Sequence, residues 1–331
     1  MAKNTNLTDA KKAKNDEFYT RIEDIEKELK HYKDFFRGKV VFCNCGDAIH
    51  HNFGKYFSMN FEHLGLKKLI CTSFEMDGSH GKVAIYEGDK NGNYIPDSDE
   101  WTTYKLEGNG DFRSAECVEL LKQSDVAVSN PPFSLFREYV AQLMEYGKKF
   151  LIIGNKNAIT YKEIFPLIKD NKLWLGISAP TAYSTPLKEV ENEKTQYKEN
   201  GVVYQKFGNH GWFTNIEHSM RNLPLDLYKK YNPKDYPKYD NYDAINVDKT
   251  SDIPMDYDGV MGVPISFLDK YCPTQFEIVG GFNRYKECDY ENGLLCGTPT
   301  LYIDKNGTEI IWRGPTVNKK NCYFRILIRR K

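Results

Sequence analysis

The sequence predicts an α/β fold with a doubly wound parallel sheet, followed by a smaller and irregular α+β region toward the C-terminus. Two observations predict this fold. Short apolar runs typical of buried strands alternate with amphipathic stretches of helical period as far as about residue 170. Beyond that point the alternation weakens and the chain becomes rich in Tyr, Asn, Pro and Gly. With 331 residues, 40% of them hydrophobic and 14% aromatic, the chain is long enough to bury such a core.

The first ordered element expected along the chain is a helix. Residues 1–15 are rich in Lys and Asn and lack apolar periodicity, which predicts a flexible basic arm. Apolar side chains then recur at helical spacing at Ile22, Ile25, Leu29, Tyr32 and Phe36. Thr20-Arg21-Ile22-Glu23 has the form of a capping box at the start of this helix, and Gly38 is expected to end it.

The elements of the sheet follow in order. The expected strands of the sheet are 39–44, 66–74, 125–129 and 150–153, and the expected helices are 50–64, 115–122 and one that contains Phe136, Val140 and Leu143. Residues 82–106 form a hairpin excursion around the turn-rich segment 89–93. Short strand-like runs recur later at 202–207, 212–214, 276–280, 301–303 and 323–328. The predicted organisation is an arm at 1–15, a main domain at 16–222 and a second region at 223–331.

Composition excludes several classes of protein. No apolar run approaches the length of about 18 residues that a membrane-spanning helix needs, and the N-terminus is polar, which predicts a cytoplasmic protein without membrane association. The eight cysteines are expected to be reduced thiols, and the close pair Cys43 and Cys45 lacks the further ligands of a zinc site, so no metal is expected.

The distribution of charge is more informative than its sum. The net charge is zero, but seven basic residues and no acidic ones lie between Arg313 and Lys331. Such a segment suits a side of the molecule that faces phosphates. A basic tail kept for solubility explains the charge equally well.

The strongest chemical signal is Asn130-Pro131-Pro132-Phe133. It follows an apolar strand and precedes a helix, and ligands of open α/β sheets bind beyond the carboxyl ends of the strands. An amino group on an aromatic ring is a poor nucleophile because its lone pair is delocalised, so it needs acceptors for its two hydrogens. The side-chain oxygen of Asn130 and the backbone oxygen of Pro131 can supply both, while Pro132 stiffens the turn and Phe133 stacks on the base. The structural alternative is that the prolines end the strand and Phe133 joins the core.

Asn-Pro-Pro-Phe is the catalytic motif of amino-group methyltransferases, and over about residues 14–285 the chain resembles the EcoRI-type adenine-specific DNA methyltransferases. The other segments that carry the resemblance are Lys14–Thr20, Val40–Asp47, Gly110–Arg113, Gly154–Ala158 and Trp212–Asn215. The resemblance implies a Rossmann-like methyltransferase sheet and site-specific methylation of adenine N6 in double-stranded DNA, on a base flipped out of the duplex. It also implies that target recognition belongs to the C-terminal region.

A site for the cofactor S-adenosyl-L-methionine is implied as well. The residues implied for it are Glu17, Phe18, Tyr19, Thr20, Asn44, Gly46, Asp47, Glu75, Asp111 and Phe112. Those up to Thr20 would hold the methionine end of the cofactor, and Asp111 and Phe112 its adenine. Asn44 stands where the family usually has a glycine, and Asn tolerates left-handed backbone conformations. Glu75 is the first choice for the carboxylate that holds the ribose hydroxyls, and Asp77 is the second.

Residues for the DNA substrate are less sharply marked. Asn155, Lys156 and Asn157 follow a buried strand and are expected at the same edge as Asn130, where they would position the base or a phosphate; a plain polar turn is the alternative. Asn215 resembles part of a late family motif. A monomer is expected, with a restriction endonuclease as a functional partner. The rival functions are methylation of an RNA or protein amino group and a DNA-binding module without catalysis, and cofactor binding would distinguish the second of these.

Overall fold

The computed structural model describes residues 19–44, 46, 48, 49, 51–284, 288–303 and 309–331. The predicted arm at 1–15 and the predicted cofactor residues Glu17, Phe18 and Asp47 lie outside these ranges. The chain forms two compact units. The first takes in the chain as far as Lys156 and then Gly176–His218, and the second takes in Asn157–Leu175 and Ser219–Lys331. The chain therefore enters the second unit once at 157, well before the boundary that the sequence pattern predicts at Asn222.

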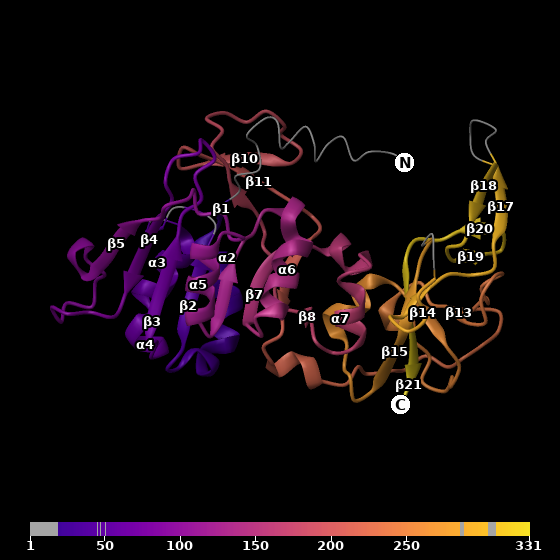
Figure 1. Cartoon of the computed structure of the whole chain (residues 1–331). Coiled ribbons are helices and arrows are strands. Elements are labelled where there is room, and N and C mark those ends of the chain that lie inside the picture. Colours follow the sequence, from indigo (N-terminus) through magenta and orange to yellow (C-terminus); the bar gives the residue numbers. More distant parts are fainter. Residues whose placement is uncertain (1–18, 45, 47, 50, 285–287, 304–308) are drawn as a thin grey trace. The chain divides into compact units, whose positions relative to one another are not determined.

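The first unit is built on a mixed sheet whose strand order is β5-β4-β3-β2-β6-β7-β12 (Figure 1). Its strands are β2 (Val40–Asn44), β3 (Lys68–Thr72), β4 (Lys82–Tyr86), β5 (Trp101–Lys105), β6 (Val126–Ser129), β7 (Lys149–Asn155) and β12 (His210–Thr214). The centre, β3-β2-β6-β7, is parallel as predicted. The prediction of an all-parallel sheet is wrong at the edges, because the β4–β5 hairpin pairs antiparallel with β3 and β12 returns antiparallel beside β7.

Helices cover both faces of this sheet, as a doubly wound arrangement requires. On one face, Ile25, Leu29 and Phe57 pack with strand residues in a single buried cluster. On the other, the ring of Phe136 lies 5.0 Å from that of Phe213, and it sits so close to Gly154 that a Cβ there would come within 2.4 Å of it. The helices are α2 (Ile22–Leu29), η1 (Lys30–Phe36), α3 (Asn52–Met59), α4 (Phe61–Leu64), η2 (Ser98–Glu100), α5 (Ala115–Gln123), η3 (Phe133–Leu135) and α6 (Phe136–Glu145).

The N-terminal end of the described chain is a strand rather than a helix cap. β1 (Tyr19–Thr20) pairs antiparallel with β9 (Tyr183–Ser184) in a small sheet of order β1-β9-β11-β10, completed by β11 (Val202–Gln205) and β10 (Gln196–Glu199). Helix α2 starts after Arg21, which makes no side-chain capping bond. The predicted capping box is therefore wrong, because the backbone of Thr20 belongs to a strand.

A buried carboxylate ties α2 to the segment that follows residue 175. Glu28 accepts hydrogen bonds from the Tyr32 hydroxyl at 2.9 Å and from the amides of Ile177 and Ser178 at 2.9 and 2.6 Å. Since Glu28 is fully buried, these bonds replace the water that its charge would otherwise need.

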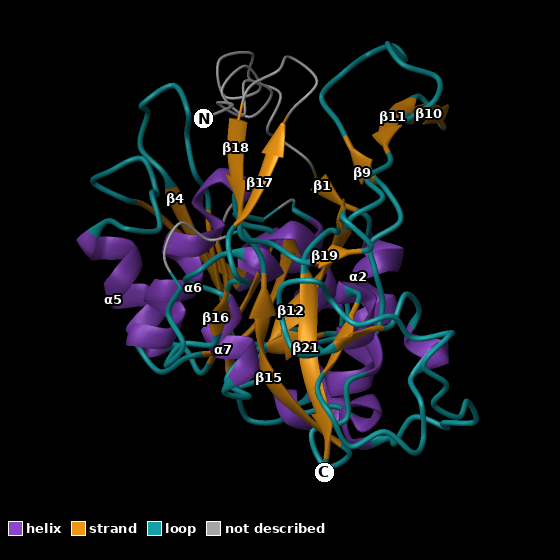
Figure 2. Cartoon of the chain, turned by 90° about the vertical axis from the view of Figure 1, so that its right-hand side faces the viewer, coloured by secondary structure: helices purple, strands orange, loops and turns teal. Residues whose placement is uncertain are grey.

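The second unit is rich in short strands, as the irregular C-terminal pattern predicts. A sheet of order β13-β14-β21-β15-β16 is accompanied by the hairpins β17–β18 and β19–β20. Figure 1 labels β13, β14 and β20, and Figure 2 labels β15, β16 and β21. Helix α7 packs within this unit, where the ring of Phe165 lies 5.6 Å from that of Phe324 and next to Gly281. In the ranges that the structure describes, no helix is both long enough and apolar enough to cross a membrane. The elements are η4 (Lys156–Thr160, starting at the crossing between the units), α7 (Phe165–Lys169), β8 (Trp174–Leu175), η5 (Ser219–Asn222), β13 (Ile245–Asn246), η6 (Thr250–Asp252), β14 (Met261–Val263), η7 (Ile265–Lys270), β15 (Phe276–Phe282), β16 (Leu294–Leu295), β17 (Thr300–Ile303), β18 (Glu309–Trp312), β19 (Thr316–Val317), β20 (Lys320–Asn321) and β21 (Arg325–Arg330).

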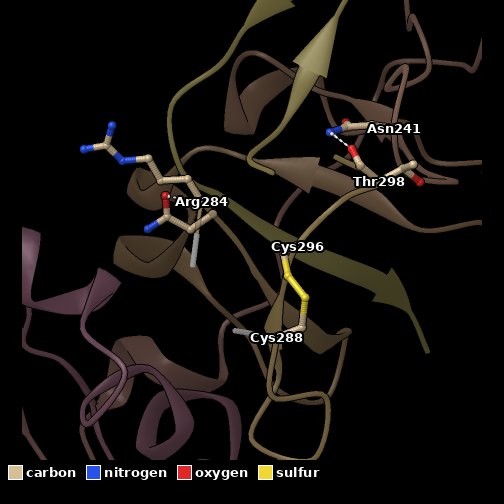
Figure 3. The surroundings of a disulfide bond; sticks show 6 residues. Asn241, Arg284, Cys288, Cys296 and Thr298 are labelled. Carbon is tan, nitrogen blue, oxygen red and sulfur yellow. Dashed lines mark hydrogen bonds between the residues drawn. A yellow bond between two sulfur atoms is a disulfide. The ribbon is translucent and has the colours of Figure 1, made fainter. Parts of the chain in front are cut away.

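Two cysteines of the second unit form a disulfide, which corrects the prediction that all eight are free thiols. Cys288 and Cys296 are eight positions apart in sequence and joined at a Cα–Cα distance of 5.7 Å (Figure 3). That distance lies within the range a disulfide spans. The local chain reversal that ends in β16 brings the two together, and this could not be inferred from their spacing. Cys43, Cys71, Cys117, Cys272 and Cys322 form no disulfide.

Candidate active site

The carboxyl ends of the parallel strands gather the predicted site residues at one edge of the sheet. Asn44 ends β2 and Asn155 ends β7, while Asn130 follows directly after β6 between them. His210, the first residue of antiparallel β12, pairs with Asn155 and so lies at the same edge. This is the edge at which ligands bind in open α/β sheets.

The motif Asn130-Pro131-Pro132-Phe133 forms the turn between β6 and α6. Pro131 is buried, and the carbonyl of Pro132 accepts a hydrogen bond from the amide of Leu135 at 2.9 Å, which closes the short helix η3. Asn130 and Phe133 are half-buried, and the Phe133 ring packs on the rim of the core. The turn therefore holds a polar and an aromatic residue next to each other at the strand end. Both residues are half-buried, and the Oδ1 atom of Asn130 is itself buried.

Asn44 is held by two hydroxyl groups. Its side-chain Oδ1 accepts a hydrogen bond from Tyr139, and its backbone carbonyl accepts one from Ser129, the residue before the Asn-Pro-Pro-Phe motif. Asn44 is the last residue of β2 and does not adopt the left-handed conformation by which the sequence analysis explained it. The positive φ of this turn falls on Gly46 instead, at 139°.

The residues predicted to contact the ribose and the adenine of the cofactor lie on two loops that pack against each other. Gly110 has a φ of 85°, and a Cβ at this position would lie 1.8 Å from the backbone oxygen of Ser73. The amide of Glu75 donates to the carbonyl of Asn109 at 2.9 Å, so the loop after β3 is clasped to the loop before α5. This brings Glu75 next to the segment that contains Asp111. Asp77, by contrast, is exposed and accepts a bond from the amide of Ser79 within its own turn.

Asp111 and Phe112 occupy the second of these loops. Arg113 donates to Asp111 at 2.6 Å, and this hydrogen bond lowers the pKa of the Asp111 carboxyl, which is therefore an ionised acceptor at neutral pH. Phe112 is only 6% exposed; its ring meets the ring of Tyr139 edge to face at 5.0 Å. Its carbonyl accepts from Gln142 at 3.0 Å, so helix α6 holds this loop in place.

The N-terminal element contains a feature that fits a polar cofactor. Among the described residues the hydroxyl of Thr20 has no hydrogen-bond partner, although it is buried. The backbone carbonyl of Thr20 accepts from Asn52 at 2.7 Å, and Tyr19 beside it is 39% exposed. A buried hydroxyl without a partner is costly, so this position suits a ligand that hydrogen-bonds to it. The described part of the chain contains no group of His, Cys, Asp or Glu side chains that could hold a metal ion.

The residues predicted for the substrate are not all at this edge. The carboxamide oxygen of Asn155 lies 3.3 Å from Asn209, and the amide of Lys156 donates to the carbonyl of Asn209 at 2.7 Å. Asn157 belongs to the second unit. Asn215 lies at the opposite edge, where its Oδ1 accepts from the amide of Phe150 at 2.9 Å. Because β12 runs antiparallel to β7, the residue after its end falls beside the start of β7, and the structure does not bring Asn215 to the site.

Comparisons with known proteins show the family of this chain. The family model described as "Adenine-specific methyltransferase EcoRI" matches residues 6–331. The chain belongs to this family. The predicted family is thereby confirmed, and the protein is an adenine-specific DNA methyltransferase.

Three curated relatives are similar over most of their length. The type II methyltransferase M.EcoRI of Escherichia coli is 44% identical over 345 aligned positions, which cover 100% of this chain and 98% of the relative. M.MgeORF184P of Mycoplasma genitalium is 39% identical, covering 97% of this chain and 98% of its own. M.MpnI of Mycoplasma pneumoniae is 42% identical over an alignment that covers 82% of this chain and 83% of the relative. No solved structure matches the chain.

An aromatic cluster of the methyltransferase was not found from its sequence. The ring of His210 lies 4.5 Å from Phe133 and is stacked on Phe207 at 4.6 Å. Its Nδ1 is 3.0 Å from the hydroxyl of Tyr183. Phe207 is half-buried like Phe133, so the cluster has two partly accessible aromatic residues at the Asn-Pro-Pro-Phe motif. The available signal was the pair Phe207 and His210 just before a predicted strand, but only the antiparallel course of β12 brings them to this edge.

We predict that His210 makes the methyltransferase sensitive to mild acid. Burial lowers the pKa of His210 from 6.5 to about 4, so the unfolded chain takes up a proton on this residue at a higher pH than the folded protein does. The stability that follows is complete above about pH 6.5 and is lost as the pH falls toward 4, by about 3 kcal/mol in total. Urea unfolding at several pH values measures it. The difference in stability between the wild type and His210→Asn should shrink across this range, and a difference independent of pH would contradict the prediction.

Proposed function

We propose that the protein transfers a methyl group from S-adenosyl-L-methionine to the N6 amino group of an adenine that has been flipped out of double-stranded DNA. The observation that carries this proposal is the position of Asn130-Pro131-Pro132-Phe133 at the carboxyl end of β6, where Asn130 and Phe133 lie next to each other and are both half-buried. When bound, the cofactor supplies the methyl group as an electrophile.

In this proposal the protein activates the amino group by orienting it. The Oδ1 of Asn130 and the carbonyl of Pro131 accept the two hydrogens of N6, which turns its lone pair toward the methyl donor. The prolines cannot donate backbone hydrogen bonds and limit backbone rotation, so the acceptors stay in fixed directions. The extra proton on nitrogen leaves to water after transfer, and no acid or base from the chain is required.

The flipped base needs aromatic surfaces to replace its lost stacking, which costs a few kcal/mol. In this proposal Phe133 supplies one, and Phe207, which is stacked on His210, supplies another. Because His210 is neutral at physiological pH, this cluster places no positive charge beside the base. The sheet edge of the first unit thus supplies both the amino-group acceptors and the stacking surfaces.

The cofactor is proposed to lie across the same edge. Tyr19 and Thr20 would contact its methionine end, together with Asn44 and Gly46 in the turn after β2. The clasp at Gly110 favours Glu75 over Asp77 for the ribose hydroxyls, because it brings Glu75 beside the loop of Asp111 and Phe112. With Phe112 largely buried, its contact with the cofactor's adenine would be through the ring edge or after a small opening of the loop.

The second unit is proposed to recognise the DNA target. Two basic side chains of its C-terminal segment already pair with acidic residues of the same unit. Arg325 bonds to Asp248 at 3.3 Å, and Arg329 lies 3.8 Å from Glu277. Lys319 and Lys320, exposed at the turn of the β19–β20 hairpin, are better candidates for phosphate contacts.

We further propose a monomer that works beside a restriction endonuclease, by analogy with relatives named type II methyltransferases.

Incubation with tritiated S-adenosyl-L-methionine and unmethylated genomic DNA tests the proposal. Nucleoside analysis of the digested DNA should give label in N6-methyladenine. Cofactor binding without label in DNA would redirect the search to RNA or protein amino groups, and absence of cofactor binding would favour a DNA-binding module without catalysis.

A further inference from the structure

Tyr139 is a fully buried tyrosine that touches two separate parts of the proposed cofactor site. It lies on α6, one turn after the helix begins, and its side chain faces the sheet. A phenylalanine could fill the same space, so packing alone does not explain the hydroxyl group. Its role follows from what the hydroxyl and the ring contact.

The hydroxyl orients Asn44. It donates to the Oδ1 of Asn44, which lies at the end of β2 and is itself buried. An amide whose oxygen is held in this way presents its Nδ2 donor on the opposite side. Asn44 stands at the turn proposed to contact the cofactor, so Tyr139 determines in which direction this residue offers its donor.

The ring orients Phe112. The two rings meet edge to face at 5.0 Å with an interplanar angle of 86°, a favourable geometry for an aromatic pair. One turn later on the same helix, Gln142 donates to the carbonyl of Phe112 at 3.0 Å. Helix α6 therefore contacts both the loop of Phe112 and the side chain of Asn44.

We propose that Tyr139 is a positioning residue for the cofactor, which fixes Asn44 through its hydroxyl group and Phe112 through its ring. The inference rests on the proposed function, in which both residues contact S-adenosyl-L-methionine. Since only the short helix η3 separates the Asn-Pro-Pro-Phe motif from α6, Tyr139 also sets the distance between the bound cofactor and the turn that presents the adenine.

Tyr139→Phe tests the inference in the full-length protein, because it removes the hydroxyl and keeps the ring. Steady-state methylation of DNA should show a KM for S-adenosyl-L-methionine raised roughly five- to tenfold, as expected for one lost hydrogen bond to an oriented group. The kcat at saturating cofactor should stay within about twofold and the KM for DNA should not change. An unchanged cofactor KM, or a fall in kcat alone, would overturn the inference.

Two further variants separate positioning from a general loss of stability. Tyr32→Phe removes an equally buried hydroxyl that bonds to Glu28, away from the site, and should lower the melting temperature to a similar extent without changing the cofactor KM. Asn44→Ala removes the acceptor, so adding Tyr139→Phe to it should raise the cofactor KM no further. A full additional increase in the double variant would contradict a role through Asn44. If the wild-type protein itself transferred no label from the cofactor, the proposed function would fail instead.

Discussion

Asn130→Ala is expected to reduce kcat for DNA methylation by at least about 100-fold, because the amino group loses the side-chain acceptor that orients it. Cofactor affinity should change little, because Asn130 is proposed to bind the adenine amino group and not the cofactor. Stability should also change little, because Asn130 as a whole is only half-buried, although its Oδ1 atom is enclosed. Single-turnover methylation and cofactor titration measure the two effects separately.

A matched control for this variant is Asn60→Ala. Asn60 lies at the end of α3, where its side chain donates to the carbonyl of Tyr56 at 2.8 Å, far in sequence from the motif. It should retain wild-type kcat. Methylation above a tenth of the wild-type rate in Asn130→Ala would contradict the proposed role of Asn130.

Gly110→Ala is expected to destabilise the first unit by about 3 kcal/mol or more and to weaken cofactor binding. An added Cβ would lie 1.8 Å from the backbone oxygen of Ser73, and no side-chain rotation can relieve a clash with backbone. The loop that carries Asp111 and Phe112 would have to move away from the loop that carries Glu75. Chemical unfolding and cofactor titration should both register this change.

Gly78→Ala distinguishes this clash from the cost of a positive φ. Gly78 has a φ of 82°, close to the 85° of Gly110, but nothing lies within 4 Å of an added Cβ. It should cost only about 1 to 2 kcal/mol. Equal losses of stability in the two variants would show that the close approach to Ser73 is unimportant.

The central sheet and the Asn-Pro-Pro-Phe turn were predictable because each depends on local pattern. The apolar runs at 40–44 and 126–129 are buried parallel strands, and the place of Asn130 after one of them follows from that alone. The edge strands were not predictable in the same way. A hairpin such as β4–β5 has the same pattern whether it stands apart or joins a sheet, and only tertiary packing decides.

The same limit applies to individual site residues. Asn215 was assigned to the substrate by resemblance, but the direction of β12 takes it to the opposite edge. His210 arrives at the site for the same topological reason. Asn44 was explained through backbone conformation, whereas the structure uses its side chain, and the partner Tyr139 lies 95 positions away in the sequence. Contacts over such separations leave no local pattern to interpret.

The early crossing of the chain into the second unit has a consequence during protein synthesis. Helix α7 leaves the ribosome more than a hundred residues before Gly281 and Phe324, against which its Phe165 packs. Its apolar side therefore lacks these partners while Gly176–His218 completes the first unit. A fragment that stops at Asn222 would keep that apolar side exposed for its whole lifetime, so truncation at the boundary suggested by the sequence pattern would yield an aggregation-prone product.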